Sequence, residues 1–299
     1  MTTTLEPTVR VRVETMAPAP TLRPVKSHRR RDWGRHLAIQ LLLAMQLFPV
    51  YMMLQVSLKD NRSFLSNPWL PDAPADWRWE NWSFATRLVL PYLANTMFVA
   101  VLATAGTLTL AVLGAYFFGR YRMPGGRVLW AAFMMLMLMP TIANLVPQFA
   151  LLTTMDLLNT LWALIVVGIA GSQAFCIYVL RNFIEEIPRD LFEAAEIDGA
   201  GHLAQIRNIV VPMSLPVLST LAIVTFLDRW NEFVLPLIVL RDPEKFPIGV
   251  GLIYLEGEYV KHWGRIMAAF SMASLPLIVL FLFTMRTFVR GLASGAVKG

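Results

Sequence analysis

Long stretches without charged residues constrain this chain more than any other feature of its sequence. Such runs cover residues 37–58, 88–119, 128–155, 157–180, 208–227 and 266–285. A helix that crosses a bilayer needs about 20 mostly apolar residues, because the hydrocarbon core is about 30 Å thick and each helical residue rises about 1.5 Å. Each run reaches that length, so the sequence predicts an all-α polytopic membrane protein with six transmembrane helices.

The composition agrees with this interpretation. The chain is 56% hydrophobic and only 15% charged, whereas soluble domains are about 25% charged. Pro212 and Pro216 interrupt the fifth run, so its span is expected to begin near Leu215. The predicted spans are about 37–58, 92–119, 128–152, 158–180, 215–240 and 266–287, and they belong to one transmembrane domain, 33–299.

Residues 1–32 differ from the rest of the chain. They are rich in proline and threonine and nearly lack aromatic side chains, which predicts a disordered tail. No short apolar core follows the early charges, so the tail is not expected to be a cleavable signal peptide.

The distribution of lysine and arginine predicts the orientation. With the N-terminus inside, the inner segments hold fifteen of these residues when the N-terminal tail is counted only from Arg23, near the first span. The outer segments hold eight, spread over two long loops. Cytoplasmic loops carry an excess of positive charge. We therefore expect both termini in the cytoplasm.

Several function classes find no support in the sequence. The single cysteine, Cys176, cannot form an internal disulfide, and no set of residues has the spacing of a metal site. The phosphate-binding pattern of ATPases and the catalytic motifs of metalloproteases are absent. The net charge of +6 sits beside apolar runs, as membrane topology requires, so no nucleic-acid partner is expected. The chain is predicted to be no enzyme and to bind no cofactor or metal itself.

The most informative segment is the inner loop 184–214. Pro188 suits the start of a helix, and Gly199 or Gly201 can end it, after which Leu203, Ile206 and Val210 recur at helical spacing. This pattern predicts two short cytoplasmic helices joined by a glycine bend. Ala194 and Ala195 would form a low ridge that fits a partner's groove, and Glu193 could receive a basic side chain of that partner.

This segment resembles the EAA loop of ABC importer permeases. The resemblance is carried by Glu193, Ala194, Ala195, Asp198, Gly199, Ala200, Ile209 and Pro212, with Pro216 following. It implies that the loop is a coupling helix that docks into a nucleotide-binding subunit, with ATP and Mg²⁺ held by two partner ATPase subunits. It also implies a second homologous permease subunit, an extracytoplasmic solute-binding protein and a place in the bacterial inner membrane.

Further motifs resemble the maltose-type carbohydrate branch of these permeases. They are Glu80-Asn81-Trp82, Trp230-Asn231-Glu232-Phe233 and the tail from Gly291 to Gly299. The branch implies a sugar or oligosaccharide as the solute, and a tail, here including Gly295 and Lys298, that faces the ATPase. The alternatives are a non-sugar solute such as a glycerol-phosphate or polyamine, a secondary transporter, or an intramembrane enzyme, for which no catalytic set is present.

The fifth span contains an unusual group of polar residues. Asp228 and Glu232 would share a helix face with Asn231 beside them, and Arg229 could pair with Glu232. Charges at this depth cost at least about 2.5 kcal/mol each, so they are usually paired or turned to a cavity. Asp228, Asn231 and Glu232 are therefore candidates for the translocation path, with a structural ion pair as the alternative.

The outer loop 59–87 carries four tryptophans, Trp69, Trp77, Trp79 and Trp82. Tryptophan is favoured at the membrane interface. A docking surface for an external partner is the second interpretation.

Overall fold

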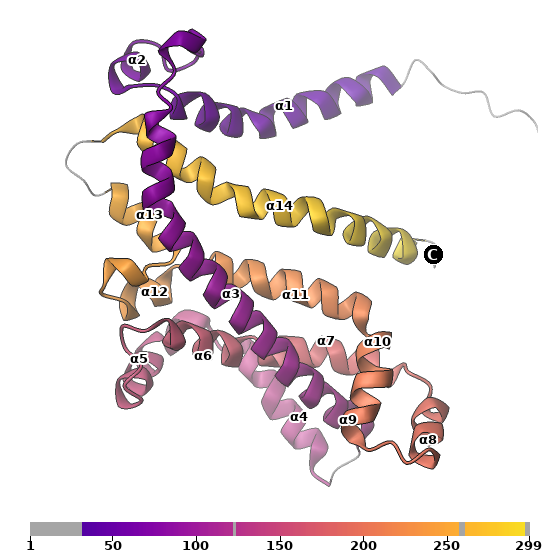
Figure 1. The fold of residues 1–299 in the computed structure, drawn as a ribbon. Coiled ribbons are helices and arrows are strands. Elements are labelled where there is room, and N and C mark those ends of the chain that lie inside the picture. The colour runs from indigo at the N-terminus through magenta and orange to yellow at the C-terminus, as the bar shows by residue number, and fades with distance from the viewer. Residues whose placement is uncertain (1–31, 122–123, 257–260, 297–299) are drawn as a thin grey trace, which may run out of the picture. The chain divides into compact units, whose positions relative to one another are not determined.

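The computed structural model describes residues 32–121, 124–256 and 261–296, and every regular element within these ranges is a helix. The α-helices are α1 (Asp32–Ser57), α2 (Asn61–Ser66), α3 (Glu80–Arg120), α4 (Gly126–Met135), α5 (Leu145–Thr154), α6 (Leu161–Gly171), α7 (Gln173–Glu185), α8 (Arg189–Ile197), α9 (His202–Gln205), α10 (Val211–Met213), α11 (Leu215–Trp230), α12 (Val234–Val239), α13 (Ile248–Glu256) and α14 (Trp263–Ala296) (Figure 1). The all-α prediction is confirmed for the described residues, whereas the predicted disordered tail lies outside them, apart from its last residue.

The chain divides into two units, Met1–Phe48 and Pro49–Gly299. The described part of the first unit is the beginning of α1, an apolar helix long enough to cross a bilayer. The contacts considered below all lie within the second unit.

The long helix α3 organises the second unit. It packs against α6, α7, α11, α13 and α14, and it crosses α11 and α14 obliquely (Figure 1). Alanines with no exposed surface, among them Ala100, Ala103, Ala111 and Ala115, line its buried side. Small side chains of this kind let helix backbones approach closely in a membrane. A Cβ atom added to Gly114 would lie 2.7 Å from Cδ1 of Ile177 on α7, so α3 and α7 approach closely at this glycine.

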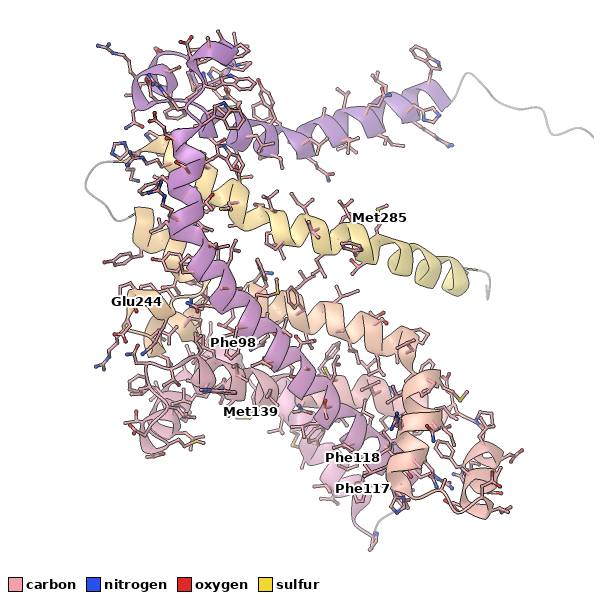
Figure 2. All side chains as sticks on the ribbon, in the orientation of Figure 1. Phe98, Phe117, Phe118, Met139, Glu244 and Met285 are labelled. Atoms are coloured by element: carbon pink, nitrogen blue, oxygen red, sulfur yellow. The ribbon has the colours of Figure 1, made fainter. Side chains whose placement is uncertain are left out.

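Larger side chains fill the positions between these small residues. Phe98 on α3 meets Trp162 on α6 edge to face, with ring centroids 6.1 Å apart, and the side chains of Phe117 and Phe118 lie near the other end of α3 (Figure 2). Two buried clusters result. One joins α3 to α6, α12, α13 and α14, and the other joins the end of α3 to α7 and the loop that follows.

Three helices of the described chain are long and apolar enough to cross a membrane, and the number rises to six if each of three bent pairs is one span. The predicted third span is interrupted at Pro140, which separates α4 from α5. The fourth bends by 42° between α6 and α7. The second is longer than predicted, because α3 already begins at Glu80.

The fifth span begins at Leu215, as the prolines predicted, and its helical part ends at Val239. It is broken at residues 231–233, between α11 and α12. Pro236 explains the break, because a proline lacks an N–H group and its ring clashes with the carbonyl group four residues earlier, here that of Glu232.

Candidate functional site

Two short helices with a glycine bend between them connect α7 to α11, as the sequence predicted. Pro188 immediately precedes α8, and Gly199 follows it with φ +79°, a left-handed conformation that favours glycine. The amide of Ala200 donates to the carbonyl of Ala195 at 2.8 Å, which closes the last turn of α8. The space around Gly199 is open, so its backbone angle and not crowding requires a glycine.

The first of these helices is anchored to the end of α3. Phe192 is buried, and its ring lies 6.4 Å from that of Tyr116, with the guanidinium of Arg120 5.0 Å above it. Arg120 also pairs with Glu196 at 3.2 Å. One face of α8 is therefore fixed against α3.

A buried glutamine that sequence reasoning missed anchors the second helix. Gln205 is 1% exposed, accepts a hydrogen bond from the Tyr116 hydroxyl at 2.8 Å and donates to the carbonyl of Ala200 at 3.2 Å. The hydroxyl of Tyr121 lies 3.0 Å from Nδ1 of His202. The predicted apolar face of this helix is wrong at Leu203, which is 75% exposed. A π-helical turn at Ile206–Val210 changes the helical register, so regular spacing could not find the buried side.

The outer face of the loop carries the residues of the EAA resemblance. Glu193 and Ala194 are exposed and Ala195 is half-buried, while Asp198 and Gly199 are exposed at the bend. Ala200 is half-buried beyond the bend, and Pro212 lies in α10. Large apolar side chains surround this ridge: Leu191, Ile197 and Leu203 are 43%, 86% and 75% exposed. An exposed apolar edge beside charged residues has the character of a protein-binding surface.

The polar residues of the fifth span form a charged group around Arg229. Its guanidinium contacts Asp228 and lies 3.9 Å from Glu232, so the predicted pairing with Glu232 is confirmed. The prediction that Asp228 and Glu232 share a helix face is wrong, because α11 ends at Trp230. Asn231 donates to the carbonyl of Leu227 at 2.8 Å.

Burial separates the two carboxylates. The side chain of Asp228 is 57% exposed, that of Glu232 is 28% exposed and that of Arg229 is 12% exposed. Nε of Arg229 has no hydrogen-bond partner in the described structure. The largely buried guanidinium of Arg229 therefore pairs with one exposed carboxylate, Asp228, and lies near a more enclosed one, Glu232.

The motif before the second span has a structural role. The side-chain amide of Asn81 donates to the carbonyls of Ser57 and Lys59 at 3.0 and 2.9 Å, and the indole of Trp82 donates to the Ser57 hydroxyl at 3.0 Å. The two bonds of Asn81 satisfy the carbonyl of Ser57, the last residue of α1, and that of Lys59 just beyond the helix. Of the other tryptophans, Trp77 donates to the carbonyl of Asp72 at 3.1 Å, and Trp69 and Trp79 are exposed.

Gly295, predicted to face a partner, lies in the last turns of α14, and Lys298 lies outside the described residues. The described part of the chain holds no group of three or more histidine, cysteine or acidic residues arranged to bind a metal ion.

Comparisons with known proteins agree with this architecture. The chain is 32% identical over 267 residues to the sulfoquinovosyl glycerol transport system permease protein SmoH of Agrobacterium fabrum, covering 89% of this chain and 93% of that protein. It is 28% identical to the maltose/maltodextrin transport system permease protein MalG of Escherichia coli, covering 92% of this chain and 98% of that protein.

A solved structure has the same fold. A bacterial ABC transporter involved in the import of the acidic polysaccharide alginate matches with a TM-score of 0.76 and 22% identity over 88% of this chain and 99% of that one. Residues 111–294 match the family model described as binding-protein-dependent transport system inner membrane component. The chain therefore belongs to this family of inner-membrane transport components.

Proposed function

We propose that this chain is the permease subunit of an ABC importer for a sugar or oligosaccharide, and that its 184–214 loop couples it to ATPase subunits. It would form half of the translocation path with a second homologous permease. Two nucleotide-binding subunits would bind ATP and Mg²⁺, and an extracytoplasmic binding protein would deliver the solute. Both termini would lie in the cytoplasm, in agreement with the distribution of lysine and arginine.

One observation carries the coupling role: the loop is exposed on one face and anchored on the other. Leu191, Ala194 and Ile197 are accessible, whereas Phe192 is buried against α3. A partner that moves α8 would therefore also move the end of α3, the helix that packs against α6, α7, α11, α13 and α14. A surface joined in this way to the core can bias a two-state transition of the helices.

The named relatives support the substrate class. Their names refer to sulfoquinovosyl glycerol and to maltose and maltodextrin, which all contain a sugar ring. Asp228, Asn231 and Glu232 are the proposed polar residues of the path. The exposure of Asp228 favours this role for it, while Glu232 is more enclosed beside Arg229. A glycerol-phosphate or polyamine remains the alternative solute.

Single-cysteine cross-linking tests the coupling role. The only native cysteine, Cys176, is buried, so Cys176→Ser combined with Ala194→Cys leaves one accessible thiol. We expect this thiol to react with a membrane-impermeant maleimide only from the cytoplasmic side, and to cross-link to the ATPase subunit. Cys176→Ser with Arg241→Cys is the matched control, since Arg241 follows α12 in a predicted outer loop.

A charge reversal provides the second test. Glu193→Arg should abolish co-purification of the ATPase without affecting membrane insertion, whereas Glu244→Arg, on the predicted outer side, should preserve it. Labelling of position 194 from outside, or normal co-purification of Glu193→Arg, would contradict the proposal.

A further inference from the structure

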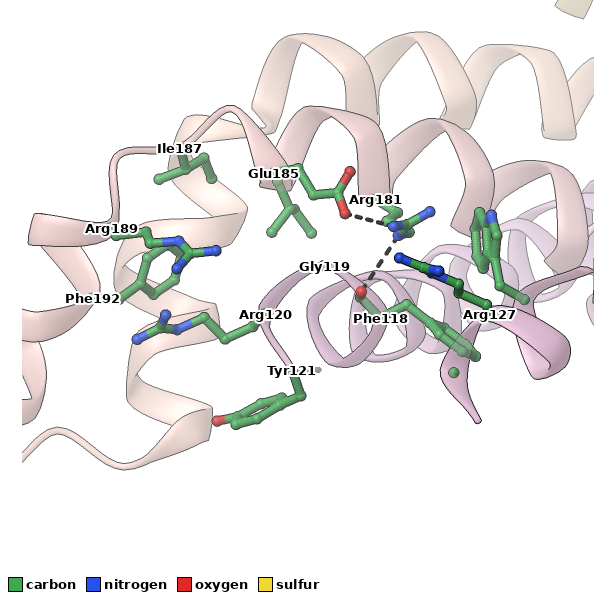
Figure 3. A pocket seen from close by; sticks show the side chains of 13 residues that line it. Phe118, Gly119, Arg120, Tyr121, Arg127, Arg181, Glu185, Ile187, Arg189 and Phe192 are labelled. Carbon is green, nitrogen blue, oxygen red and sulfur yellow. Dashed lines mark hydrogen bonds and ion pairs between the residues drawn. The ribbon is translucent and has the colours of Figure 1, made fainter. Parts of the chain in front are cut away.

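A cleft lined by arginines opens where α3 and α7 end and α4 and α8 begin. Its volume is about 680 Å³. Among the residues that the structure describes, its charged lining consists of Arg120, Arg127, Arg181 and Arg189 and one acidic residue, Glu185. Figure 3 shows Arg120 and Arg189 near Phe192 at one end, and Arg127 beside Arg181 at the other.

Only two of these arginines have an acidic partner. Arg181 pairs with Glu185 at 2.6 Å, and Arg120 pairs with Glu196 at 3.2 Å. Arg127 and Arg189 are exposed and make no ion pair within the described part of the chain. The cleft therefore carries an uncompensated positive charge, which a bound anion would neutralise.

Aromatic rings hold two of the guanidinium groups in place. The guanidinium carbon of Arg181 lies 4.3 Å from the ring centroid of Trp130, and the guanidinium carbon of Arg120 lies 5.0 Å from that of Phe192. Nε of Arg181 also donates to the carbonyl of Phe118 at 3.4 Å. Side chains already fixed in this way lose less conformational entropy when a ligand binds.

The position of the cleft along the helices indicates the kind of anion. Arg120 and Arg181 directly follow the apolar runs of α3 and α7, which places the cleft at the edge of the hydrocarbon layer. Trp130 is a residue type favoured at this depth. Val128 and Leu129, beside Arg127, are 75% and 51% exposed, so apolar surface adjoins the charged cleft.

We propose that this cleft binds the phosphate group of an anionic phospholipid, with the acyl chains on the adjoining apolar surface. Arginine binds phosphate oxygens through paired, charge-assisted hydrogen bonds. Basic pockets between helices on the cytoplasmic side are suited to such headgroups. The inference depends on the membrane location of the family and on the proposed cytoplasmic position of this face, and not on the partner proposed for the 184–214 loop.

Lipid titration of the full-length chain in its purified transporter complex tests this proposal. Phosphatidylglycerol, phosphatidylcholine with the same acyl chains, and inorganic phosphate are added in parallel after delipidation, and bound lipid is counted by native mass spectrometry. The wild type should retain phosphatidylglycerol in preference to both other ligands. Loss of a charged hydrogen-bond donor should weaken binding about tenfold, so Arg127→Gln with Arg189→Gln should remove the preference.

The matched control is Arg207→Gln, which removes an exposed arginine of the same loop outside the cleft. It should keep the preference for phosphatidylglycerol, whereas general attraction between lipid and positive charge would weaken binding in this variant too. An unchanged preference in the double variant overturns the proposal. Equal competition by inorganic phosphate also overturns it, because the site would then hold a soluble anion.

Discussion

Lys59 is expected to hold the predicted outer loop, residues 59–87, in place, and its replacement by methionine tests this. The lysine is 1% exposed, and its ammonium group donates to the carbonyls of Asn67 and Leu70 at 2.7 and 2.6 Å and to Asp72 at 2.9 Å. Asp72 also accepts a hydrogen bond from Ser63. A single cation thus ties together the segment that links α2 to α3.

The size of the effect follows from the groups left without a donor. Breaking a buried ion pair costs about 3–5 kcal/mol, and each unsatisfied buried polar group costs about 1–3 kcal/mol. The side chain of Asp72 is 17% exposed and keeps its bond to Ser63. We therefore expect Lys59→Met to destabilise the folded loop by about 3 kcal/mol, the lower end of the range for a broken buried ion pair. This corresponds to a rise of about a hundredfold in opening of the loop.

Hydrogen exchange of peptides covering residues 59–79 measures this opening. Lys245→Met is a matched control, because Lys245 pairs with Asp242 at the same distance of 2.9 Å, but the two side chains are 42% and 54% exposed. Exposed pairs contribute little to stability, so this variant should exchange like the wild type. Equal effects of the two substitutions would refute the argument from burial.

The same pair should respond to acid. Burial raises the pKa of Asp72, but hydrogen bonds from Ser63 and Lys59 and the charge of Lys59 outweigh it, and the pKa is lowered from 3.8. A carboxylate whose pKa is lower in the folded state stabilises that state above its unfolded pKa, and the contribution is lost as the pH falls through the folded value. Protection of the outer loop should therefore decrease below about pH 4 in the wild type and less so in Lys59→Met.

Other substitutions test the packing of the loop and the helices. Gly199→Ala should destabilise the loop by about 1 kcal/mol because of its positive φ, whereas Gly201→Ala, at φ −70° and with equally open space, should be neutral in thermal unfolding. Gly264→Ala should reduce the yield of folded protein, because the added methyl group would overlap the carbonyl oxygen of Lys59 and the side-chain amide of Asn81. Tyr116→Phe should cost about 1–3 kcal/mol by leaving Gln205 without its donor, and Tyr116→Phe with Gln205→Leu should cost less than the sum of the two single substitutions.

The sequence was informative where a signal depends on neighbouring residues. Apolar runs located the helices, the two prolines marked the start of α11, and Gly199 marked the bend of the loop. Pro236 could have predicted the break before α12, because a proline inside a helical segment interrupts the helix, as Pro140 does between α4 and α5. Its position within an apolar run hid this, and the polar residues of 228–232 were treated as one helical face.

The sequence was silent where contacts join distant segments. Lys59 looked like an ordinary loop cation, and only the folded chain brings three oxygen atoms around it. The burial of Gln205 depends on a π-helical turn and on Tyr116, 89 residues away. The arginine cleft likewise combines arginines from four helices. In the sequence, each of these arginines looks like the ordinary basic flank of a membrane span.

The positions of the polar contacts suggest how α3 would transmit movement in the proposed mechanism. Asn81 ties its outer end to the end of α1, and Tyr116 and Arg120 tie its inner end to the 184–214 loop. Between these ends, alanines and glycines of α3 make close contacts with α6 and α7. Two hydrogen bonds add to them: the Thr107 carbonyl accepts from the side-chain amide of Gln173 at 3.2 Å, and the Thr96 hydroxyl accepts from the backbone N–H of Ile248 at 2.7 Å. Helices packed through small side chains alone can slide by small amounts, whereas polar contacts fix their partners. A displacement of α8 should therefore move the inner end of α3 together with the loop, rather than separate the loop from the helix.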